Sequence, residues 1–144
     1  MDQKMFCYQC QETAGCKGCT VVGVCGKQPD VAAMQDLLVW VTKGISAVTT
    51  RLREEGRAVA DEVNHLVTEN LFTTITNANF DKAAIEKRIE KTLEMKTALW
   101  EQLERRDNLP EAAGWTGEPS EFIKKASEAG VLIGQNEDII PFAA

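Results

Sequence analysis

Apolar residues recur at steps of three and four from residue 31 onward, which is the spacing of one buried face of an α-helix. The first such stretch predicts a helix that begins at Asp30 as its N-cap and stops at Gly56. Its apolar positions share one face: Val31, Met34, Leu37, Leu38, Val41, Ile45, Val48 and Leu52.

Two further helices are predicted by the same spacing. One covers Val59 to Asn77, and the other runs from Asp81, as N-cap, to Arg106. The third helix has a face dense in Glu, Lys and Arg, which we interpret as solvated. Its apolar positions are Ile85, Ile89, Leu93, Leu99, Trp100 and Leu103. Three helices joined by short turns predict an antiparallel three-helix bundle.

The rest of the chain after the third helix divides into a loop, a short helix and a tail. Proline and glycine interrupt residues 108–119, which predicts a loop. A short helix is then expected from Ser120, as its cap, to Ala129, with Gly130 ending it. The chain contains no convincing strand pattern, so the fold class is all-α. We expect one domain in three parts: residues 1–29, 30–107 and 108–144.

Composition narrows the range of functions. The 144 residues carry a net charge of −6 and the pI is near 4.9, which argues against nucleic acid and anionic membranes as partners. No apolar run approaches the ~20 residues of a membrane span. The first residues lack the apolar stretch of a secretory signal, so the cytoplasm is the expected location.

All five cysteines fall in the first 25 residues, at positions 7, 10, 16, 19 and 25. An odd number of thiols crowded together is a poor disulfide framework, whereas soft thiolates bind zinc, copper(I) or iron–sulfur clusters. The two CxxC pairs lie too close together for a zinc ribbon, and the ferredoxin spacings are not matched. Spacing therefore favours an iron–sulfur cluster, and zinc or free thiols stay open as alternatives.

The cysteine segment differs from the rest of the chain in two other ways. It contains Gly15, Gly18, Gly23 and Gly26, which allow tight turns and a close backbone approach to a cluster. Three lysines oppose two acidic residues there, so an anionic cluster would sit in the one region that is not acidic.

Other candidate chemistry is weak. His65 is the single histidine, and on a helix it is expected to be a surface or packing residue, so no catalytic triad can be built. No phosphate-binding loop is present. Trp40, Trp100 and Trp115 are expected in the core or at an interface. We assign no catalytic residue.

The segment MFCYQCQETAGCKGCTVVGVCGK resembles the opening of the hybrid cluster proteins, also called prismane proteins or hydroxylamine reductases. The resemblance extends to about Ile139 and includes four further motifs: QDLLVWVTKGISA (Gln35–Ala47), LFTTITNANFD (Leu71–Asp81), LPEAAGWTG (Leu109–Gly117) and GQNEDI (Gly134–Ile139). It covers only the N-terminal part of the family's first helical domain.

The resemblance implies a set of ligands. The family's C-x2-C-x8-C-x5-C motif holds a [4Fe–4S] cluster, and it falls here on Cys7, Cys10, Cys19 and Cys25. Cys16 has no counterpart and would be a spare thiol. Zinc becomes a minor alternative, as a mis-incorporated metal.

The resemblance also implies an electron-transfer role. Family members are several times longer, and later domains hold the hybrid cluster at which hydroxylamine is reduced. This chain would relay electrons and be inactive alone, with the remaining domains or an electron donor protein as partners. A zinc-binding or metal-free interaction domain is the alternative function. We also expect a dimer, because consecutive apolar residues 37–41 cannot all face one three-helix core.

Overall fold

The computed structural model describes residues 5–75 and 81–130, and within these ranges the chain is helical. This confirms the all-α prediction. The α-helices are α1 (Pro29–Glu54), α2 (Asp61–Ile75), α3 (Lys82–Trp100), α4 (Glu111–Gly114) and α5 (Phe122–Ala129). The predicted end of the second helix at Asn77 and the tail 131–144 lie outside the described residues.

Helix α1 begins two residues earlier than predicted. Pro29 occupies its first position, where a missing N–H costs nothing, and Gln28 is the N-cap, so the assignment of Asp30 as N-cap is wrong. The predicted stop is confirmed. Gly56 has φ +77, and its N–H donates a hydrogen bond to the carbonyl of Arg53. The N–H of Arg57 donates to the carbonyl of Leu52.

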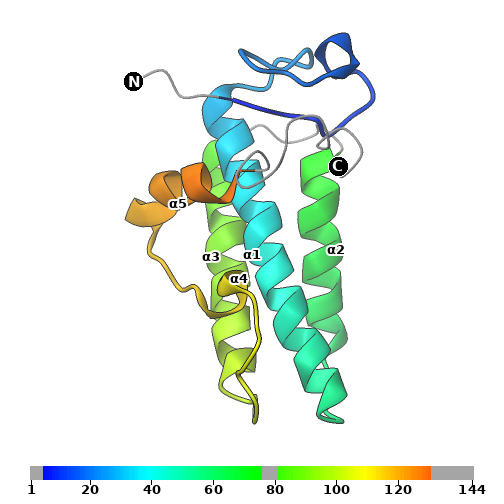
Figure 1. The fold of residues 1–144 in the computed structure, drawn as a ribbon, viewed down its shortest axis with the longest axis vertical. Helices are drawn as coiled ribbons and strands as arrows, with labels where there is room; N and C mark the ends of the chain where they lie inside the picture. The colour runs from blue at the N-terminus through cyan, green and yellow to red at the C-terminus, as the bar shows by residue number, and fades with distance from the viewer. Residues whose placement is uncertain (1–4, 76–80, 131–144) are drawn as a thin grey trace.

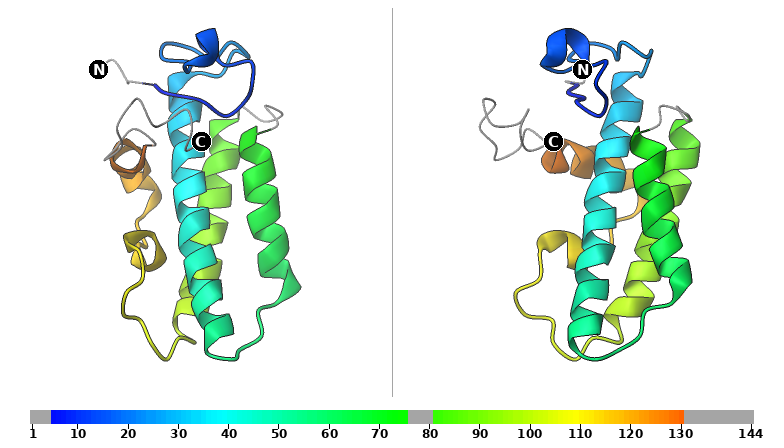
Figure 2. Two further views of the ribbon diagram at one scale, coloured as in Figure 1. Left: turned by 45° about the vertical axis from the view of Figure 1, so that its right-hand side comes forward. Right: turned by 90° about the vertical axis from the view of Figure 1, so that its right-hand side faces the viewer.

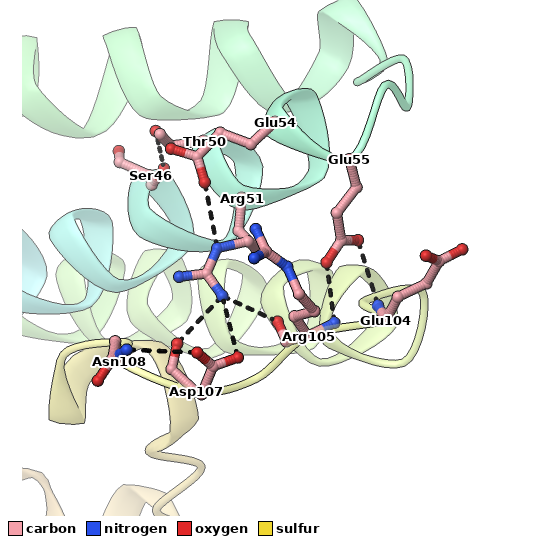
Figure 3. Close-up of polar contacts among 9 residues, drawn as sticks. All are labelled: Ser46, Thr50, Arg51, Glu54, Glu55, Glu104, Arg105, Asp107 and Asn108. Atoms are coloured by element: carbon pink, nitrogen blue, oxygen red, sulfur yellow. Dashed lines mark hydrogen bonds and ion pairs between the residues drawn. The ribbon is translucent and has the colours of Figure 1, made fainter.

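Helix α3 begins where the sequence predicted, since the Asp81 carboxylate accepts from the backbone N–H groups of Ala83 and Ala84. It ends at Trp100, not at Arg106. The reason is that side chains at the C-terminal end of α1 bind the main chain of the segment that follows α3 (Figure 3).

Two side chains hold residues 104–107, one from Arg51 of α1 and one from Glu55, the C-cap of α1. The Glu55 carboxylate accepts from the N–H groups of Arg105 and Glu104, which lowers the pKa of Glu55. The Arg51 guanidinium donates to the carbonyls of Arg105 and Asp107. Backbone N–H and C=O groups that are hydrogen-bonded to side chains in this way do not require the partners that a helix would supply.

The successive helices α1, α2 and α3 run antiparallel to one another, as predicted (Figure 1). Helix α1 lies at the centre: α2 and α3 pack on one side of it, and residues 109–129 lie on the other (Figure 2). A buried polar group ties the three long helices together, because the Asn70 amide of α2 donates to Thr42 of α1 and Thr92 of α3. Such a satisfied network fixes one register.

Residues 109–129 form a folded cover over α1, whereas the sequence predicted a loop over residues 108–119 and a short helix after it. Helix α4 lies within the predicted loop. Trp115 packs edge-on against Trp40, with ring centroids 5.6 Å apart, and also contacts Phe122, which is fully buried. Helix α5 ends before Gly130 as predicted, but Ser120 is not its cap. Glu118 and Glu121 instead form a capping box around the preceding 3-10 turn.

This cover changes the expectation for α1. Leu37, Leu38 and Val41 are fully buried, and Val39 and Trp40 are half-buried, so the expectation that this face stays exposed is wrong. Self-association remains a prediction, but this face no longer supports it.

The burial of α1 also bears on membranes. In the described part of the chain, α1 alone is long and apolar enough to cross a membrane, and 61% of the window that meets this test is buried inside the fold. It is therefore placed as the core helix of the bundle, and this helix does not indicate a membrane protein.

A close approach between the cover and α1 depends on a glycine. A Cβ at Gly44 would lie 2.2 Å from the carbonyl oxygen of Ala112. We expect Gly44→Ala to lower the free energy of unfolding by about 1–3 kcal/mol, because backbone must move apart. Urea denaturation measures this. Gly114→Ala is the matched control, since its Cβ would meet only the Trp100 ring, at 3.6 Å; equal losses in both variants would contradict the packing described.

A buried lysine gives the cover a pH dependence. Lys96 is 1% exposed and its ammonium donates to the carbonyls of Ala112 and Trp115. Burial lowers the pKa of Lys96 from 10.5 to about 8. Between these values the unfolded chain binds more protons than the folded chain, so stability rises with pH across this window.

We therefore expect the free energy of unfolding to rise by about 1–3 kcal/mol between pH 7 and pH 10 in the wild type, relative to Lys96→Met. Denaturation curves at both pH values measure the difference. The exposed Lys91→Met is the control and should keep the wild-type slope. A Lys96→Met variant with an unchanged slope would contradict the assignment.

Candidate metal centre

The cysteine segment crosses the end of the bundle at which α1 begins (Figure 1). Cys7 and Cys19 form an isolated antiparallel bridge, and each accepts the other's N–H on its carbonyl, at 3.0 and 2.9 Å. This pairing places two cysteines that are twelve positions apart in sequence side by side.

Gly18 permits this bridge. Its φ of +127 lies in the left-handed region, and a Cβ there would lie 2.3 Å from the Phe6 ring. Gly15 and Gly26 also have positive φ, which agrees with the predicted need for tight turns.

The sulfur of Cys19 is surrounded by donors. The N–H of Ala14 lies 3.4 Å from its Sγ and the Thr13 hydroxyl 3.6 Å. Burial raises the pKa of this thiol, but hydrogen bonds from the backbone of Ala14 and Val24, the Thr13 hydroxyl and the charge of Lys27 lower the pKa below its ordinary value overall. The loop therefore favours a thiolate at Cys19, the form that ligates metals.

Cys7 has a different partner. The Lys27 ammonium lies 3.4 Å from its Sγ, and Lys27 is 1% exposed. On the inner side, Met5 and Cys19 pack against Ala32 of α1, with Cys7 beside them. Helix α1 thus supplies the wall that keeps water from one side of the pair.

The other cysteines are less enclosed. Cys10 is half-buried, and Cys16 and Cys25 are exposed. Cys25 follows Val24, whose N–H reaches Cys19, so it lies on the segment next to the pair. All five thiols are free, and no three metal-ligating side chains of the described residues converge on one point. The structure thus brings Cys7 and Cys19 together, and the complete set of four remains a prediction.

Residues outside the cysteines also shape the site, and the sequence analysis did not single them out. Thr13 and Lys27 contact the sulfurs directly. Asp36, two turns into α1, is affected by the site, since burial raises its pKa to about 7 while the charge of Lys27 lowers it. A lysine two residues after the last cysteine carries no sign of burial in a single sequence. His65 is exposed on α2, as expected.

The fold and the loop together define a helical bundle domain with a thiol-rich loop, of the composition that suits soft metals. The chain belongs to the Prismane/CO dehydrogenase family, whose profile matches residues 5–141.

Curated relatives agree with this assignment. The chain is 49% identical over 140 residues to a hydroxylamine reductase of Desulfovibrio desulfuricans, covering 96% of this chain and 26% of the relative. It is 52% identical over 142 residues to that of Clostridium perfringens, covering 94% and 26%. For Bacteroides fragilis the identity is 50% over 135 residues, covering 94% and 24%. The chain thus spans about a quarter of these relatives.

Proposed function

We propose that this chain binds a [4Fe–4S] cluster through Cys7, Cys10, Cys19 and Cys25 and serves as an electron-transfer module. The observation that carries the proposal is the environment of the Cys7–Cys19 pair. The Ala14 N–H donates to the Cys19 sulfur, whose pKa is lowered, and the Lys27 ammonium donates to the Cys7 sulfur.

The residues present fit such a group by the chemistry of their donors. When bound, a cubane cluster supplies a one-electron carrier. The chain's own groups would do the rest. The N–H groups of Ala14 and Val24 donate to the Cys19 sulfur, and the Thr13 hydroxyl, which donates to the Cys7 carbonyl, lies 3.6 Å from that sulfur. Ala32 excludes water from the inner side. Cys16 is exposed on a turn with φ +56, and we assign it no role as a ligand.

The relatives extend the proposal to a reaction. They are named hydroxylamine reductases and are about four times as long as this chain. We propose that the module relays electrons toward the reduction of hydroxylamine, at a centre held by residues beyond these 144. Free thiols fit the reducing cytoplasm as its location.

The surface supports a partner at the loop end of the bundle. Of the large apolar side chains exposed in the described residues, most lie on the cysteine loop or near the C-terminal end of α2, which reaches the same end (Figure 1). They are Val21, Val22, Val24, Leu71, Phe72 and Ile75. We propose that the remaining domains of such a reductase, or an electron donor protein, contact this end.

Single substitutions test the ligand set. We expect Ser at Cys7, Cys10, Cys19 or Cys25 to lose or damage the cluster, because each removes a thiolate, whereas Cys16→Ser keeps it. Iron, sulfide and zinc analysis with the absorbance near 400 nm, on anaerobically reconstituted protein, measures this. If Cys16→Ser bleaches the protein and Cys25→Ser does not, the ligands are Cys7, Cys10, Cys16 and Cys19. Stoichiometric zinc without iron in the wild type would favour a structural zinc domain.

Activity gives a second test. We expect the cluster-loaded 144-residue chain not to turn over hydroxylamine with a reduced dye, because it spans only about a quarter of the reductases it is similar to and the proposed reducing centre is held by residues outside it. Ammonia release measures turnover, and a full-length relative is the positive control. A comparable rate from the contaminant-free chain would contradict the division of roles proposed.

A further inference from the structure

Lys27 is buried in an unusual way. It is 1% exposed, yet among the described residues it forms no ion pair with a carboxylate. Within the described residues, its ammonium donates to the Cys7 sulfur, at 3.4 Å.

The backbone holds Lys27 in this position. The N–H of Gly23 bonds the carbonyl of Lys27 at 2.8 Å, and that of Gly26 bonds Gly23 at 2.8 Å, which closes a tight turn. A Cβ at Gly23 would lie 2.9 Å from the Cβ of Lys27. The turn therefore packs closely against the start of the lysine side chain and fixes the backbone from which it extends.

Burying an ammonium without an anion is costly. The nearby acid is a weak counter-charge, because burial keeps the pKa of Asp36 at about 7 and much of it is neutral at that pH. A neutral thiol at Cys7 would leave the group in direct contact with the Lys27 ammonium uncharged, and of the described residues only the Cys19 sulfur and Asp36 would then feel its charge. A metal-bound thiolate would compensate it.

We propose that the Lys27 ammonium is the buried counter-charge of the cluster bound through Cys7. Lys27 is then a positioning residue whose charge favours the reduced state of that cluster. This inference rests on the proposed function. Adding one electron makes the bound group more negative by one charge, and a fixed positive charge beside it stabilises that product more than the reactant.

The test compares midpoint potentials of reconstituted wild type, Lys27→Met and Lys27→Arg, titrated with dithionite at fixed pH and salt and followed by EPR. We expect a shift to a more negative potential in Lys27→Met and little shift in Lys27→Arg. Lys17→Met, in the same loop but exposed, is the matched control and should titrate as the wild type. An unshifted Lys27→Met would overturn the inference.

Loss of the cluster is also informative. If Lys27→Met cannot hold it and Lys27→Arg can, the charge is required, which supports the inference. If neither variant holds it while helicity by circular dichroism stays intact, the role of Lys27 is packing and the inference fails.

A wild type that takes up no cluster would instead refute the proposed function. The role of Lys27 is then tested in the metal-free chain, in a variant that keeps Cys7 as its only cysteine. Slower alkylation of Cys7 in Lys27→Met than in Lys27→Arg would support a charge that acts on this sulfur, and equal rates would overturn it.

Discussion

The structure depends on one requirement, which is that the apolar surface of α1 be covered on two opposite sides. A helix with apolar residues around most of its circumference cannot be satisfied by two neighbours. Helices α2 and α3 bury one side, and Trp115 and Phe122 bring the cover onto the other. The candidate metal centre depends on the same helix, because Ala32 of α1 forms the floor beneath Cys7 and Cys19.

Two lysines are buried against α1 or beside its start, and the fold treats them differently. Lys96 donates to two main-chain carbonyls, which are good acceptors whether the amine is charged or neutral. The Lys27 ammonium donates to the Cys7 sulfur, and a sulfur is a weak acceptor unless it is anionic. The first lysine is satisfied by the fold alone, and the second is compensated only when negative charge is present in the loop.

Periodicity predicted the fold class, the order of the long helices and the cap at Asp81, because these depend on local spacing and local hydrogen bonds. It placed the end of α3 six residues too late, since Arg51 and Glu55, about fifty positions away, decide where that helix stops. The set of four cysteines follows from the resemblance and stays a prediction. The pairing of Cys7 with Cys19 could not be predicted, because it depends on a bridge between segments.

The position of the cover in the chain has a consequence for synthesis. Helix α1 ends at Glu54, but the residues that shield its outer side begin only after Leu109. On the ribosome, α1 and its two bundle partners are therefore made before that side can be closed. Until Phe122 has emerged, the nascent chain presents an open apolar surface to the cell. The cover is thus the last part of the described fold to be synthesised. Chaperones that bind exposed apolar helices have an interval in which to bind the chain.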